Sequence, residues 1–191
     1  IHATQLTVDG SIRSDGSSPS TSLAGGGAGG SVHISASELR GAGQITARGG
    51  AGGTDGGNIV GKGGGGGGGR ISLYADSQSS FSGTLSVIGG SGFQKGSAGT
   101  VFSIDRSASS TGGSLLVENY ADSESLLTEL YTVVNTLSPY GALDLLSAAS
   151  NARVIYKIPG ATLNVKNISG DGTGTLMIAN DTIIAPSANS V

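Results

Sequence analysis

The chain has 191 residues; 36 are glycine, none is cysteine or tryptophan, and only 12% are charged. The formal net charge is −3 and the basic residues are scattered singly, which argues against nucleic acid as a partner. The lack of cysteine excludes a disulfide framework, a zinc-finger site and a thiol nucleophile. No apolar run approaches the roughly 18 residues of a membrane-spanning helix. The continuous G-X-Y period that is typical of collagen is also absent.

Short runs of alternating apolar and polar residues predict β-strands along the whole chain. Ser and Thr often separate the apolar residues, and this period of two is typical of a strand with one buried face. Glycine, Asn, Asp or Ser bounds most of these runs. The expected strands lie in the runs 6–8, 32–34, 71–73, 85–87, 101–104, 115–117, 143–146, 154–158, 163–165, 176–178 and 183–184.

The spacing of these runs indicates a degenerate repeat. Two runs with a turn of small residues between them begin 13 or 14 residues apart, at positions 32 and 45, 71 and 85, 101 and 115, and 163 and 176. Residues 29–34 align with 68–73, and residues 44–50 align with 84–90, at an offset of 39 to 40. The third unit follows the second by 30 residues. The repeating unit is therefore strand, turn, strand and a glycine loop of variable length.

This repeat predicts an all-β fold, a right-handed parallel β-solenoid. One pair of short strands cannot bury its apolar side, whereas stacked coils align equivalent strands around a long narrow core. We expect residues 1–119 to form glycine-rich repeats, residues 120–140 to connect, and residues 141–191 to add further rungs of the same domain. A β-sandwich of antiparallel hairpins is the alternative, because many gaps between the runs are short enough for hairpin turns.

Residues 123–134 have a different pattern. Leu126, Leu130 and Tyr131 fall on helical spacing, and Ser123 is a suitable N-cap residue. The pattern predicts a short helix over 123–134, with a strand over 131–137 as the alternative.

Glycine is concentrated in residues 49–69, which hold 14 glycines, including the run Gly63, Gly64, Gly65, Gly66, Gly67, Gly68 and Gly69. Fixing a glycine costs roughly 0.5–1 kcal/mol more than fixing an alanine. Fourteen therefore cost about 7–14 kcal/mol, as much as the stability of a whole domain. The block is then a flexible loop, a layer of closely packed glycine chains contributed by Gly63 to Gly69, or a ligand cradle.

No motif for catalysis, a cofactor or a metal ion is found. The only histidines, His2 and His33, have no serine and acid partners in a triad pattern. Gly57 to Lys62 approaches a phosphate-binding loop, but a glycine stands where that loop needs a hydroxyl residue. The acids are dispersed and most lie at strand ends or turns, where Asp is a normal turn residue, although stacking of coils could bring Asp76 and Asp105 together. Two sequons mark Asn167 and Asn180 as possible N-glycosylation sites.

Residues 29–118 resemble the glycine-rich repeats of large extracellular and cell-surface β-helical proteins, such as autotransporter-like adhesins and wall or filament proteins. The similar segments are 25–31, 43–50, 69–71, 98–101, 115–119 and, in the tail, 170–176. The resemblance implies a secreted, non-enzymatic solenoid used as a stalk, coat, adhesin or filament. It carries over no active-site residue.

From these features we expect an extracellular structural protein without catalytic activity, the subunit of a self-assembling filament or surface coat. The expected partners are copies of the chain itself or neighbouring domains of a longer chain, and glycans. An adhesin or carbohydrate-binding module of a larger surface protein is the alternative. A polysaccharide lyase or hydrolase would need clustered carboxylates on one sheet face, which the sequence does not display.

Overall fold

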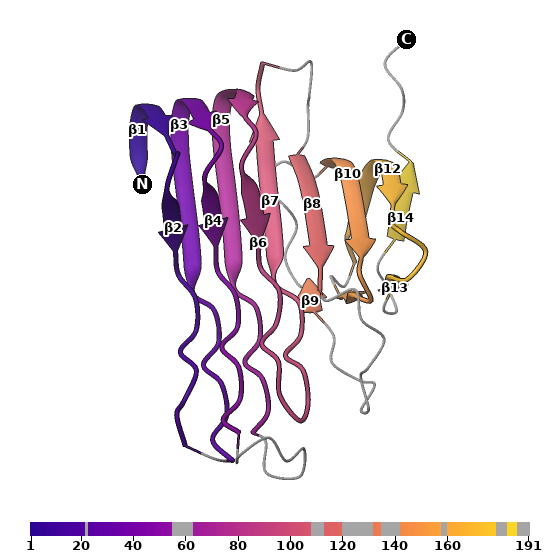
Figure 1. Ribbon diagram of the computed structural model, residues 1–191. Helices are drawn as coiled ribbons and strands as arrows, with labels where there is room; N and C mark the ends of the chain where they lie inside the picture. The colour runs from indigo at the N-terminus through magenta and orange to yellow at the C-terminus, as the bar shows by residue number, and fades with distance from the viewer. Residues whose placement is uncertain are drawn as a thin grey trace.

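The computed structural model describes residues 1–21, 23–54, 63–107, 113–119, 132–134, 142–157, 160–178 and 183–186. Every regular element in these residues is a β-strand, so the predicted all-β class is confirmed (Figure 1). The strands are β1 (His2–Thr7), β2 (Ser11–Arg13), β3 (Ser31–Gly41), β4 (Gln44–Thr46), β5 (Arg70–Phe81), β6 (Thr84–Ser86), β7 (Thr100–Asp105), β8 (Gly113–Glu118), β9 (Thr132–Val134), β10 (Ala142–Ala149), β11 (Arg153–Tyr156), β12 (Thr162–Ser169), β13 (Thr175–Ile178) and β14 (Ile183–Pro186).

The strands form one large and two small sheets. The large sheet has eight strands in the order β1-β3-β5-β7-β8-β10-β12-β14. The small sheets have the orders β2-β4-β6 and β13-β11-β9. Neighbouring strands in all three sheets are parallel, with the single exception of the pair β7 and β8. The large sheet is therefore mixed.

The strand register matches the offsets of the sequence repeat. Val32 of β3 lies opposite Ile71 of β5, an offset of 39, and Gln44 of β4 lies opposite Thr84 of β6, an offset of 40. Thr100 of β7 lies opposite Arg70, an offset of 30. Equivalent apolar residues thus stack from strand to strand, which buries a side that one strand pair alone would leave exposed.

Two separate clusters of buried side chains form the core. The first lies between the start of the large sheet and the sheet β2-β4-β6, and its largest fully buried members are Ile34, Leu39, Ile45, Ile71 and Leu73. The second lies between the end of the large sheet and the sheet β13-β11-β9, and its largest are Leu143, Leu146, Val154, Tyr156 and Leu163.

The two strands predicted within 101–117 are present as β7 and β8, but their arrangement departs from the predicted repeat. The other units place their two strands in different sheets, whereas β7 and β8 are antiparallel neighbours in the large sheet. Only seven residues separate Asp105 from Gly113, and a parallel connection within one sheet needs a dozen or more. The predicted repeat is interrupted at this point, and the strand direction of the large sheet reverses (Figure 1).

This reversal moves the core to the other face of the large sheet. Val101 pairs with Leu116, and both pack with the first cluster. The next pair, Phe102 and Leu115, packs with the second cluster. Because successive residues of a strand point to opposite faces, the two clusters lie on opposite sides of the sheet at this junction.

The helix predicted over 123–134 does not extend to its last residues, because Thr132–Val134 form the strand β9, which pairs with β11. This strand falls within the alternative prediction of 131–137. Residues 123–131 lie outside the described residues. The predicted division at 119 and 141 stays a prediction.

Candidate functional site

Extended glycine-rich segments connect the sheets of the first three repeats and lie side by side below the strands (Figure 1). Their backbones hydrogen-bond across to one another. Gly50 N donates to Gly27 O at 2.8 Å, Gly66 N donates to Gly50 O at 2.9 Å, and Gly90 N donates to Gly66 O at 2.7 Å. Gly63 to Gly69, predicted as a possible packing layer, therefore lie among segments of the repeats before and after them.

Most of these glycines leave no room for a side chain. A Cβ on Gly66 would lie 2.0 Å from Gly27 O, and one on Gly65 would lie 1.9 Å from Gly90 O. Gly64 and Gly67 differ, because a Cβ there would have its nearest contacts at 3.9 and 3.4 Å. A side chain therefore fits at one position in three, which we call the open position. This is the period of a polyproline II chain, which has three residues per turn.

A sequence signal for this packing exists in the x-Gly-Gly tripeptides of the chain. Residues 48–54 read Arg-Gly-Gly-Ala-Gly-Gly-Thr, and residues 28–31 read Ala-Gly-Gly-Ser. Arg48, Ala51 and Ala28 occupy the open position of each turn, and the glycines between them occupy the packed positions. This period of three was not predicted, because the predictions rest on the spacing of the strands. The near-match to a phosphate loop lies largely at 57–62, outside the described residues.

Asp15 connects two neighbouring glycine-rich segments by a hydrogen bond. Its carboxylate accepts a hydrogen bond from Arg48 N at 2.8 Å and another from Arg13 Nε at 3.0 Å. Partial burial opposes ionisation, but these hydrogen bonds outweigh it and lower the pKa of Asp15. The charged carboxylate therefore has a structural role.

The structure does not bring the candidate acids Asp76 and Asp105 to one face. Asp105 lies opposite Ala75 in the register, so Asp76 projects to the other side of the sheet. Asp76 pairs with Arg106 at 3.1 Å, and Asp105 accepts hydrogen bonds from Gln78 N and from Ser107. These contacts are those of turn and strand-end residues.

The described residues include only one of the two sequon asparagines. Asn167 lies on β12 with an exposed side chain, and its Nδ2 donates to Asp144 O at 3.4 Å. Asn180 lies outside the described residues, so its glycosylation stays a prediction.

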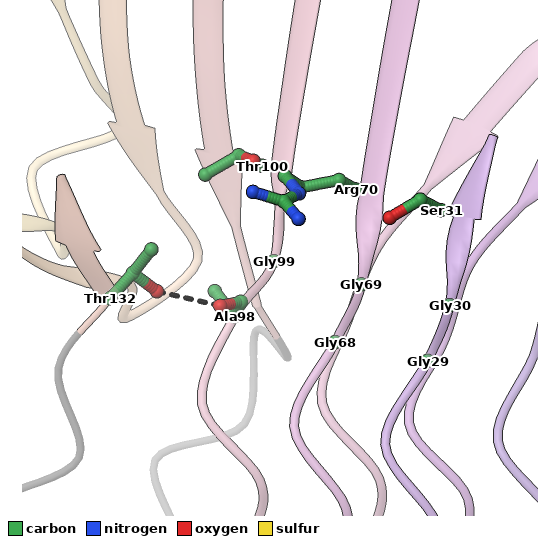
Figure 2. Close-up of a pocket in the computed structure, with 10 residues that line it drawn as sticks. All are labelled: Gly29, Gly30, Ser31, Gly68, Gly69, Arg70, Ala98, Gly99, Thr100 and Thr132. Atoms are coloured by element: carbon green, nitrogen blue, oxygen red, sulfur yellow. Dashed lines mark hydrogen bonds between the residues drawn. The ribbon is translucent and has the colours of Figure 1, made fainter. Parts of the chain in front are cut away.

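A hollow of about 300 Å³ lies where the glycine segments enter the large sheet (Figure 2). Ser31, Arg70 and Thr100, the first residues of β3, β5 and β7, border it. Thr132 of β9 also borders it and donates from Oγ1 to Ala98 O at 2.6 Å. Within the described residues the guanidinium of Arg70 has no hydrogen-bond or ion-pair partner, and Figure 2 shows it extended toward Thr100.

Further along the same three strands, aromatic side chains contact one another from strand to strand. The rings of His33 and Tyr74 have centroids 5.2 Å apart, and those of Tyr74 and Phe102 have centroids 5.9 Å apart. His33 Nδ1 lies 3.1 Å from Ser72 Oγ. The side chain of His33 is exposed on β3.

No family model matches the chain, and neither a curated protein nor a solved structure matches it. In the described part of the chain, no group of three or more acidic or histidine side chains is placed to hold a metal ion. Nor does that part contain a helix long and apolar enough to cross a membrane.

Proposed function

We propose that this chain is an extracellular structural protein, a right-handed parallel β-solenoid that self-assembles into a filament or surface coat and has no catalytic activity. Stacked repeats support the solenoid, because β1, β3, β5 and β7 follow one another in parallel register, as do β8, β10, β12 and β14. Between these strands the chain crosses to a small sheet and returns, which is the path of a coil.

The observation that carries self-assembly is the composition of the edge strand β1. This strand begins the large sheet and pairs only with β3 in the described structure. Natural proteins blunt such edges with charged residues, proline or bulges. Residues 2–7 read His-Ala-Thr-Gln-Leu-Thr and contain no proline and no Asp, Glu, Lys or Arg. An edge of six residues without these features favours pairing with a further strand, which a second copy of the chain can supply.

A second contact surface lies at the other end of the molecule. Ile168 is 58% exposed, Ile178 is 50% exposed and Met177 is 42% exposed. Met177 and Ile178 belong to β13, the edge strand of its sheet. A filament requires two contact surfaces on each subunit, and these two ends of the stack provide them.

The experiment uses Thr4→Lys, which places a charge on the exposed side of β1. Negative-stain microscopy of the wild type should show long uniform fibres, and Thr4→Lys should stop assembly at small discrete species. Thr162→Lys is the matched control, because Thr162 is also exposed but lies on the interior strand β12; it should form fibres. A wild type that remains monomeric at high concentration in light scattering would refute the proposal.

A further inference from the structure

The aromatic row of His33, Tyr74 and Phe102 is not part of the first core cluster. Val32, Ile71 and Val101, which alternate with residues of this row, are buried in that cluster. The side chains between them must therefore point to the opposite face of the sheet. Three rings from three neighbouring strands thus form a continuous surface of ring contacts on the face away from the first cluster.

The hollow lies on this same face. Ser31, Arg70 and Thr100 are in register with one another, and each lies two residues before His33, Ser72 or Phe102 on its strand. Residues two apart on a strand share a face. The polar row that borders the hollow therefore lies on the same face as the aromatic row, with Arg70 at its centre. On β5, Ser72 lies between Arg70 and Tyr74 on this face.

The second half of the molecule closes one side of this surface. Phe102 packs with the second cluster, which lies on this face, and Thr132 of β9 borders the hollow. On the other side, His33 is exposed at the strand β3. The polar and aromatic rows thus form a shelf across β3, β5 and β7, which is bounded on one side by β9 and the second cluster. The shelf is wide enough in the direction across the strands to contact an extended chain.

We infer that this shelf binds an acidic polysaccharide. Sugar rings have apolar C–H faces that pack on aromatic rings, and the hydroxyls of Ser31, Ser72 and Thr100 are suited to hydrogen bonds with sugar hydroxyls. The guanidinium of Arg70, which has no partner among the described residues, matches a carboxylate or sulfate group, which it binds by two parallel hydrogen bonds. Nucleic acid fits poorly, because Arg70 is the one cation among the described residues that border the hollow.

Affinity electrophoresis in native gels tests this inference, with polygalacturonate, dextran sulfate or neutral dextran in the gel. Polygalacturonate or dextran sulfate, but not neutral dextran, should retard the wild type. The acidic polymer that retards the protein more strongly identifies carboxylate or sulfate as the ligand group. Arg70→Gln should weaken binding about tenfold. Tyr74→Leu keeps apolar bulk but removes the flat ring, and should weaken binding several-fold while the fold is retained by circular dichroism.

Arg13→Gln is the matched control, because it removes the same charge from an exposed arginine on β2, outside the shelf. It should leave binding unchanged. The inference is overturned if neither acidic polymer retards the protein, if neutral dextran retards it equally, or if Arg13→Gln weakens binding as much as Arg70→Gln. The inference does not depend on self-assembly, and Thr4→Lys should bind the polymer like the wild type.

Discussion

Asp171 fixes the turn between β12 and β13 through both carboxylate oxygens. Its Oδ1 accepts from Thr173 Oγ1 at 2.6 Å and from Thr173 N at 2.9 Å, and its Oδ2 accepts from Ser150 N at 2.7 Å. Ser150 has a φ of 53°, in the left-handed region that residues other than glycine rarely adopt. The hydrogen bonds from the Thr173 side chain and backbone and from Ser150 lower the pKa of Asp171 to about 2.

We predict that Asp171 makes stability depend on acid pH. Because its pKa in the folded chain lies below the ordinary 3.8, the ionised carboxylate stabilises the fold above about pH 4, and this contribution is lost as the pH falls toward about 2. Urea unfolding at several pH values should show a smaller acid loss for Asp171→Asn than for the wild type.

Thr173→Ala is the companion variant, because it removes the hydroxyl donor. An NMR titration should then show a higher pKa of Asp171. An unchanged pH slope in Asp171→Asn would contradict the role assigned to this carboxylate.

Among the elements, the glycine segments depend most directly on a missing side chain. Gly66 lies between Gly27 and Gly50 of the preceding repeats and Gly90 of the following one, and its N–H and carbonyl both hydrogen-bond to these neighbours. The hydrogen bonds across segments, together with close backbone packing, offset the entropy that so many glycines lose on folding. A side chain at a packed position would push the neighbouring glycine backbones apart.

We predict opposite effects for two neighbouring alanine substitutions. Gly66→Ala should lower the free energy of unfolding by about 1–3 kcal/mol or more, because its Cβ would overlap Gly27 O. Gly67→Ala should be neutral or stabilise by about 0.4–1 kcal/mol, because its position is open and alanine restricts the unfolded chain. Urea unfolding measures both, and equal losses in the two variants would rule out a period of three.

At the scale of the whole molecule, the reversal at β7 and β8 divides the core into two clusters on opposite faces of one sheet. Leu73 belongs to the first cluster and Leu163 to the second, and each is 1% exposed. Side chains in separate clusters share no packing partners, so their contributions to stability should be independent.

We predict that Leu73→Ala and Leu163→Ala each cost about 2–5 kcal/mol and that their combined loss is additive within about 0.5 kcal/mol. The contrasting pair is Ile34→Ala with Leu73→Ala, because Ile34 and Leu73 are register partners within the first cluster. That pair should couple by about 0.5–3 kcal/mol. Denaturant unfolding of single and double variants gives both values, and strong coupling between Leu73 and Leu163 would contradict the separation of the clusters.

The sequence predicted the location of strands and the offset between stacked strands, because these depend on local alternation and on repeat length. Alternation placed strands around Val32 and Ile71, and the spacing predicted their offset, because equivalent residues of stacked strands must align. The candidate shelf was not predicted. It joins Arg70 to an aromatic row whose members are about 30 to 40 residues apart, and only the register brings them together.

The sequence by itself determined the all-β class, the positions of most strands and the offsets between repeats, because period-two burial and turn residues act over a few neighbours. The short strand β2 lies in none of the predicted runs. The sequence also contained the x-Gly-Gly period that places side chains at the open positions of the glycine segments. The tertiary structure decided that β8 turns back against β7 and that the core changes faces. Sheet membership depends on pairing with distant strands, and no local pattern of residues encodes that choice. Once β8 joins the sheet of β7, their short connection makes the pair antiparallel.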